Sequence, residues 1–455
     1  MPVNRVKHYF LYAILFLVFT QGFWERYTPI PAQPILEILI IGITLLSYKN
    51  ILNPLCYKLL FVLSVGFICS IYTASSIAYF KSIRFVLYFF FLYDIYRSTH
   101  FEIYQYLRLL KFLMGLVILQ GVASIIQIFI IGERIEGYVG YMSSLGGSTA
   151  TTFLVLVLSI CMVILLYSNN KLSRKYIYEI LLCIASAILV GYSSGKRTIY
   201  FIAPVTLVLS VFFTRIYIRR DRLMELRKKV RYIVIGTVIL FPIYIIGATS
   251  TQFKLNDRIK TSGDRMEILS GMIEYAMFYE NSEHNGSSTG RSGTTKNIVK
   301  SALNDAKYFF VGSGFGSYKD EEATKERNVI YGIVGFTRDV FSGGMIFAVL
   351  MSLWLIKVIL YHDKTEQDPF SITLRYMILF SFLFTHFAYS ADYVTHLKLT
   401  SLLIVILPII NTKEYEHIKE HLWAYIKKQY TYEYNIFYKR ENTVIWVLGY
   451  DAACL

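Results

Sequence analysis

Long apolar segments alternate with short polar ones along most of this chain. A helix needs about 20 mostly apolar residues to cross the roughly 30 Å of hydrocarbon in a bilayer. Segments of this kind recur almost from the first residue, and a single long polar stretch interrupts their regular succession. They predict membrane-spanning helices near 8–24, 32–48, 56–75, 80–96, 107–131, 147–168, 175–193, 198–215, 231–249, 335–361, 371–391 and 395–411.

The pattern predicts an all-α polytopic membrane protein with about 12 transmembrane helices. One large extracytoplasmic loop, residues 250–334, lies between the ninth and the tenth span. On this interpretation, transmembrane helices occupy residues 1–249 and 335–411, and a basic cytoplasmic tail occupies residues 412–455.

Lysine and arginine residues orient the predicted helices, because short cytoplasmic loops are enriched in both. The strongest signal is the segment RIYIRRDRLMELRKKVR at 215–231, which we place inside. Counting outwards from it in both directions keeps most basic loops on the same side. Both termini are then cytoplasmic, and residues 250–334 lie outside together with the short turns at 132–146 and 193–197.

Composition agrees with a membrane protein and excludes some functions. Hydrophobic residues make up 55% of the 455 residues and charged residues 17%, whereas about a quarter of a soluble domain is charged. The net charge of +15 lies largely in short loops between spans, so we expect no nucleic-acid partner. The cysteines lack the spacing of a metal or haem site, and none lies in the outer loop. They are Cys56, Cys69, Cys161, Cys183 and Cys454.

The outer loop is where we expect chemistry, because a connection of this length is usually functional or disordered. Its centre, NSEHNGSSTGRSGTT at 281–295, is polar and is predicted to be flexible. Apolar positions at helical spacing in 264–280 and in 296–310 predict two amphipathic helices. These would lie on the outer membrane surface or over a cavity. The alternative is that they only shield the membrane domain.

A glycine-rich segment, GSGFGSY at 312–318, follows these predicted helices. Gly312, Gly314 and Gly316 permit tight turns and a close approach of the backbone to a ligand. Exposed backbone N–H groups in such a turn can bind an anion. The segment is not a nucleotide-binding P-loop, because the ending GK[ST] is missing and the loop faces away from cytoplasmic ATP.

Several basic residues fall on the predicted outer side, against the usual distribution of charge. Guanidinium groups suit bidentate contacts with phosphate, so a converging set would suit a lipid-linked pyrophosphate. The alternative for each residue is that it extends to lipid headgroups. The residues concerned are Lys81, Arg84, Lys196, Arg197, Arg265 and Arg291.

On these motifs the chain resembles the superfamily of O-antigen polymerases (Wzy-type) and O-antigen ligases, which are bacterial envelope proteins. The segment SSGKRT at 193–198 is similar to the family's small-Ser-Arg motif. Gly290-Arg291 followed by GSGFGSY resembles its Arg…GxGxG pattern, and Gly343-Gly344 resembles the glycine pair that opens the tenth span. The match in layout covers residues 1–411.

The chain departs from the family after the glycine motif. Many members have a His-Asn pair there, whereas this chain has Arg327-Asn328. Ligases in particular resemble one another in that histidine, so its absence favours a polymerase. It also leaves the general base unassigned, since His284 lies in the flexible part and His386 and His396 lie in late spans.

The resemblance implies transfer of a growing glycan from undecaprenyl pyrophosphate to a sugar hydroxyl of a lipid-linked repeat unit. Catalytic Arg197, Arg291 and Arg265 would hold the departing pyrophosphate. Substrate-binding residues would be Lys81, Arg84, Lys196, Gly312, Gly314 and Gly316. Asp264, Glu267 or Asp305 would accept the acceptor proton. No nucleotide, metal or other cofactor is expected.

The resemblance also implies a location and partners. The chain would lie in the bacterial cytoplasmic membrane and bind undecaprenyl-pyrophosphate-linked oligosaccharide and membrane lipid. A chain-length regulator and a flippase are its expected protein partners. Two other functions remain open at this stage: a ligase that joins the glycan to a lipid or protein acceptor, and a transporter of the lipid-linked oligosaccharide.

Overall fold

The structure is a computed structural model of the whole chain, and its described part is almost entirely helical, with no β-strand. The described residues are 3–28, 32–47, 61, 64, 84, 88, 103–131, 148–167, 174–193, 198–215, 224, 226–232, 234–235, 291–315, 317, 333–360, 369–389, 393, 399–400 and 402–403.

Most described helices coincide with predicted spans. They are α1 (Val3–Tyr27), α2 (Ala32–Ser47), α5 (Ile103–Ile125) with the π-helical continuation η2 (Ile126–Ile131), α6 (Ser148–Tyr167), α7 (Arg174–Ser193), α8 (Thr198–Thr214), α14 (Gly335–Leu360) and α15 (Pro369–Phe387). The predicted spans 56–75, 80–96, 231–249 and 395–411 lie largely outside the described residues, so the number of spans stays a prediction.

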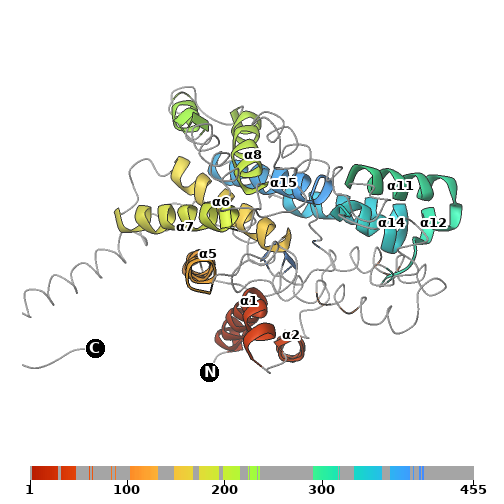
Figure 1. The fold of residues 1–455 in the computed structure, drawn as a ribbon, viewed down its shortest axis with the longest axis horizontal. Coiled ribbons are helices and arrows are strands. Elements are labelled where there is room, and N and C mark those ends of the chain that lie inside the picture. The colour runs from red at the N-terminus through yellow and green to blue at the C-terminus, as the bar shows by residue number, and fades with distance from the viewer. Residues whose placement is uncertain are drawn as a thin grey trace, which may run out of the picture.

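Helix α6 forms the centre of the bundle. It contacts α7, α8 and α15, and nearly all of its side chains from Thr151 onwards are buried. Helices α8 and α15 pack against each other, α5 packs on α7, and α1 packs on α2 (Figure 1). A helix that is apolar on all sides is typically buried, and here the neighbouring helices cover α6.

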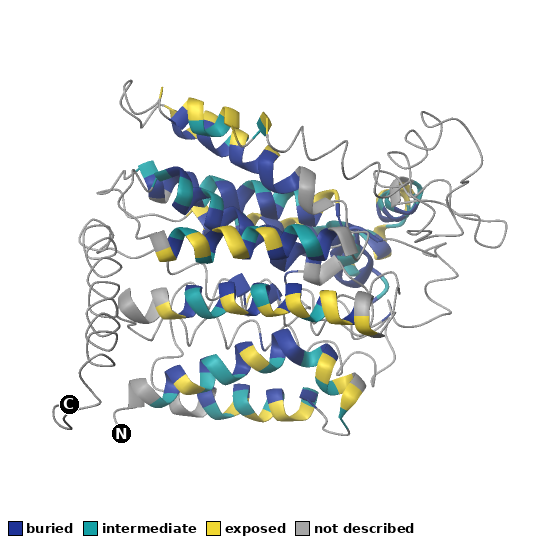
Figure 2. Cartoon of the chain, turned by 60° about the vertical axis from the view of Figure 1, so that its left-hand side comes forward, coloured by how far each residue is buried: buried dark blue, intermediate teal, exposed yellow. Residues whose placement is uncertain are grey.

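The outward faces of the bundle are apolar as well. Large hydrophobic side chains remain exposed along helices whose opposite faces are buried. Figure 2 shows exposed and buried residues alternating along these helices. Ile38 on α2 is 68% exposed and Leu182 on α7 is 53% exposed. Among the described residues, three helical stretches are long and apolar enough, by length and composition, to cross a membrane: Val6–Glu25, Arg108–Ile125 and Gly335–Leu360. The chain is therefore a helical membrane protein, because lipid is the solvent that suits such faces.

The structure of residues 291–311, in the predicted outer loop, differs from the sequence prediction in two ways. Helix α11 (Arg291–Asn304) begins inside the stretch predicted to be flexible, and it does not continue to residue 310. Helix α11 ends at Asn304 and the backbone is extended at Asp305. A second short helix, α12 (Ala306–Val311), follows. The predicted helix at 264–280 lies outside the described residues.

Helix α14 is not one continuous span as predicted for 335–361. Gly344 has a φ of 85° and a ψ of 170°, so the helix breaks there. The helices α11 and α12 lie together at one end of the bundle, beside α14 (Figure 1). Ile298 and Ala302 of α11 are fully buried in a small core with Val340 and Phe341 of α14. The loop is thus attached to the membrane domain at the break in α14.

Candidate functional site

The attachment of the loop depends on backbone packed against backbone. A methyl group added at Gly312 would lie 2.7 Å from the Gly344 nitrogen and 2.7 Å from the Phe341 carbonyl oxygen. A methyl group added at Gly344 would lie 2.7 Å from the Phe309 carbonyl oxygen. Both residues also have positive φ, at 67° and 85°. Only glycine fits both positions without strain.

One hydrogen bond fixes this contact. The backbone N–H of Ser313 donates to the Phe341 carbonyl oxygen at 2.7 Å, which satisfies a carbonyl at the end of the first part of α14. Gly314, also at positive φ, accepts from the Ser317 hydroxyl at 2.6 Å. The close approach predicted for Gly312 is therefore made to α14. Whether the turn also binds an anion is untested, and Gly316 lies outside the described residues.

A buried ionisable pair lies next to this junction. The Nε2 atom of His386 lies 3.8 Å from Oδ2 of Asp339 and 3.3 Å from the Ser352 hydroxyl. The His386 side chain is 0% exposed and the Asp339 side chain 3%. Ionisable groups inside a membrane domain are costly, so they mark functional sites more often than structural ones.

The same contacts show how sharply α14 bends. A straight helix would hold residues 339 and 352 about 20 Å apart. Yet both side chains reach one nitrogen of His386. The part of α14 before Gly344 must therefore bend sharply away from the axis of the part after it. This bend brings a carboxylate and a hydroxyl from one helix to an imidazole of another.

Aromatic rings enclose the imidazole. The Phe382 ring stacks on it at a centroid distance of 5.0 Å and an angle of 16°, and Phe387 meets it edge-on at 5.1 Å. Tyr393 is also near, and its hydroxyl shares a 2.6 Å hydrogen bond with Thr385. Burial raises the pKa of Tyr393 above its ordinary value, so its phenol stays protonated.

Sequence reasoning missed this pair. The signal was present, since Asp339 and His386 each stand in a segment predicted to span the membrane. Periodicity alone could not join them, because they are far apart in the chain and the bend at Gly344 is a tertiary feature. The general base was left unassigned because the chain lacks the family's histidine after the glycine motif. The Asp339–His386 pair contains groups that can act as a general base.

Asp305, one of the candidate bases, has a structural role. Its carboxylate accepts hydrogen bonds from the backbone N–H groups of Lys307 at 2.9 Å and Tyr308 at 3.3 Å. Its own backbone is extended, so it is the N-cap of α12. This capping explains why the predicted single helix is broken here.

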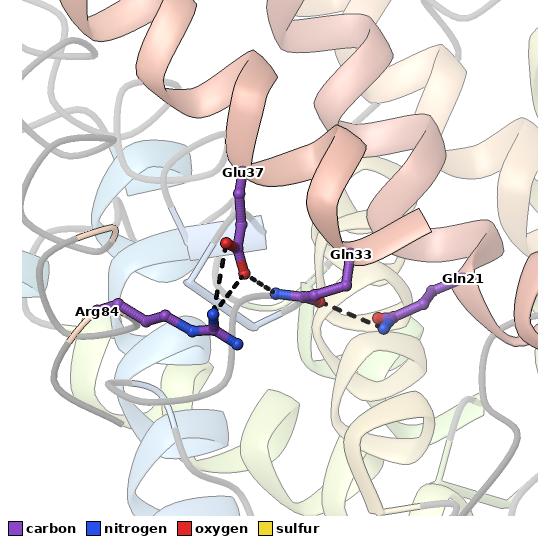
Figure 3. Close-up of polar contacts among 4 residues, drawn as sticks. All are labelled: Gln21, Gln33, Glu37 and Arg84. Atoms are coloured by element: carbon purple, nitrogen blue, oxygen red, sulfur yellow. Dashed lines mark hydrogen bonds and ion pairs between the residues drawn. The ribbon is translucent and has the colours of Figure 1, made fainter. Parts of the chain in front are cut away.

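Arg84 lies in a polar network between helix ends (Figure 3). Its guanidinium lies 3.3 Å from Oε1 of Glu37, and Gln33 donates to the same carboxylate at 3.0 Å. Gln21 of α1 donates to Gln33 at 3.5 Å, which links α1 to α2. The charge of Arg84 is thus largely balanced within the protein. An exposed pair of this kind stabilises a fold by about 0–1 kcal/mol.

The other predicted site residues are mostly beyond what the structure describes. Arg291 is described only as the first residue of α11, and its side chain is not placed. The structure therefore brings together Gly312, Gly314 and Asp305 near the start of α14, and it holds Arg84 in a separate network. Outside the described residues lie Lys81, Lys196, Arg197, Asp264, Arg265, Glu267 and Gly316.

Comparisons with known protein families, with characterised proteins and with solved structures gave no match to this chain. The resemblance to O-antigen polymerases therefore rests on the motifs and on the predicted layout. What the structure adds is a helical membrane protein whose loop is attached beside a buried Asp339–His386 pair.

Proposed function

We propose that this chain is a polymerase of a bacterial surface polysaccharide, such as O-antigen or capsule. It lies in the cytoplasmic membrane with both termini inside, and it transfers a growing glycan from undecaprenyl pyrophosphate to a sugar hydroxyl of a lipid-linked repeat unit. The reaction takes place at the outer face, where residues 250–334 meet the membrane domain. The motifs at 193–198, 290–291 and 312–318 support this proposal.

The observation that carries the proposal is the Asp339–His386 pair beside the loop. A glycan polymerase of this type needs cations for the leaving pyrophosphate and a base for the acceptor hydroxyl. Arg291 begins the helix that packs on the first part of α14, and Asp339 belongs to that same part. Both kinds of group are thus carried by elements that touch.

The acceptor oxygen attacks the anomeric carbon of the donor sugar and forms the new glycosidic bond. The bond from that carbon to the pyrophosphate oxygen breaks, and the pyrophosphate leaves with the electron pair. Arg291, with Arg197 and Arg265, stabilises the charge that develops there. The acceptor proton passes to the Asp339–His386 pair and then to water.

The test is a glycan gel of a deletion strain complemented with the wild-type gene or with Arg291→Ala. We expect the polymer ladder to collapse to a single repeat unit in the deletion strain and with Arg291→Ala, while the variant still inserts in the membrane. Loss of one such donor should slow the reaction by about 10²–10³-fold. Lys357→Ala is the matched control, because Lys357 is an exposed cation at the other end of α14.

Other outcomes separate the rival functions. An unchanged ladder in the deletion strain would remove this glycan from the proposal. Loss of even the single unit, with polymer accumulating on the lipid carrier, would indicate a ligase. Accumulation of repeat units on the inner leaflet would indicate a transporter.

A further inference from the structure

Helix α11 presents a basic face away from the protein. Lys296, Lys300 and Leu303 are exposed and follow one another at spacings of four and three residues. Such spacing places them on one side of an α-helix. The opposite side carries Ile298 and Ala302, which are fully buried against α14. The two faces therefore differ: one packs against α14, and the other is exposed.

Helix α12, which contacts α11, also has an exposed lysine and an exposed aromatic residue. Lys307 and Phe310 are exposed, whereas Tyr308 is buried against Phe341. Phe310 is 53% exposed and Leu303 of α11 is 66% exposed. We call the set Lys296, Lys300, Leu303, Lys307 and Phe310 the basic platform.

Within the described segment 291–311, basic residues outnumber acidic ones. The segment 291–311 carries Arg291 besides the three lysines, and its only acidic residue is Asp305. The Asp305 carboxylate accepts from two backbone N–H groups as the cap of α12. The platform lies at the predicted outer face, where lysine is usually scarce. An anionic partner would account for this excess.

We propose that the basic platform binds the anionic phospholipid headgroups of the outer leaflet. A water-soluble anion would require only the lysines. The two large apolar side chains among them fit a partner that has acyl chains beneath its charges, as a lipid surface does. Lysines at such a surface extend to the headgroups while apolar side chains enter the acyl boundary.

Lipid binding at the platform would act on the loop junction. The turn at Gly312 packs against Gly344 through backbone atoms, and the Ser313 N–H donates to the Phe341 carbonyl oxygen, so α12 is attached directly to the break in α14. Headgroups that hold α11 and α12 in place therefore also hold the turn. Lipid binding at the basic platform is a property separate from polysaccharide synthesis and does not require it.

The test is hydrogen–deuterium exchange of residues 291–311 in the intact protein. We would compare nanodiscs of phosphatidylcholine alone with nanodiscs that also contain phosphatidylglycerol. We expect exchange in this segment to slow in the anionic nanodiscs, by about fivefold for each lysine that reaches the headgroups. Exchange in the central helix α6 should not differ between the two lipids.

Two variants decide the assignment. In Lys296→Gln/Lys300→Gln/Lys307→Gln, the dependence on phosphatidylglycerol should disappear, whereas Lys357→Gln should keep it. Equal exchange of the wild-type segment in both lipids would overturn the proposal. Protection by a trace of undecaprenyl pyrophosphate in phosphatidylcholine, without protection by phosphatidylglycerol, would also overturn it and assign the platform to the donor. Neither readout depends on polymerase activity.

Discussion

Two buried regions of the bundle can be compared by the polar side chains that they contain and by the partners of those side chains. In the central region, Ser159 of α6 donates to the carbonyl of Val155 one turn earlier and meets the Ser381 hydroxyl of α15 at 3.1 Å. At the loop junction, a carboxylate and an imidazole from two different helices, Asp339 and His386, lie 3.8 Å apart.

This difference distinguishes buried polar groups that serve the fold from buried polar groups that serve a function. A hydroxyl that bonds to its own helix costs little in an apolar interior, because its partner is always present. An ionisable pair costs far more and is kept where chemistry or switching requires it. The break at Gly344 occurs in the second region only. Predictions can therefore be ordered by how strongly each change should affect one region and spare the other.

The largest effect is expected at the helix break. Gly344→Ala places a methyl group 2.7 Å from the Phe309 carbonyl oxygen at a φ of 85°, so strain and overpacking add. We expect a loss of roughly 3 kcal/mol or more in the free energy of unfolding. Thermal unfolding in detergent measures it. Gly115→Ala in α5 is the control, because nothing lies within 4 Å of the added methyl group and the helix should gain about 0.5–1 kcal/mol. Equal stability of both variants would refute the locked junction.

The next effect concerns activity. Asp339→Asn keeps the shape of the side chain but removes the charge beside His386. We expect polymer formation by the reconstituted protein to fall by about 10²-fold or more, with a changed pH profile, because proton transfer loses its acceptor. Ser352→Ala should retain most activity, since it leaves the pair intact. A normal rate and pH profile in Asp339→Asn would show that the pair is structural.

The smallest effect is expected in the central region. Ser159→Ala/Ser381→Ala removes both partners of one interhelical hydrogen bond, so no buried hydroxyl is stranded. We expect a change of about 0.6 kcal/mol in unfolding free energy and an unchanged glycan ladder. Thermal unfolding and the glycan gel measure the two. If this variant lost its polymer, the distinction between the regions would be wrong.

Helix positions were largely predictable from the sequence, because lipid-facing and core-facing side chains are both apolar and leave long uninterrupted runs. The predicted 147–168 and 198–215 differ by at most one residue at either end from α6 (Ser148–Tyr167) and α8 (Thr198–Thr214). Cys161 and Cys183 are buried in the apolar core.

The interruptions were harder to predict. The cap at Asp305 and the break at Gly344 depend on hydrogen bonds and on contacts with residues distant in the chain, which no local period records. Gly312 was recognised as a position of close backbone approach, and its described contact is with α14, which the sequence did not indicate. Arg84 was recognised as an outer cation, and its acidic partner Glu37 was not.

The bend in α14 has a consequence for the surrounding bilayer. Residues 345–360 rise only about 24 Å, which is less than the roughly 30 Å of hydrocarbon around them. This hydrophobic mismatch must be relieved by local thinning of the lipid or by protein that caps the shortfall. Since α11 and α12 pack over the break, they supply such a cap.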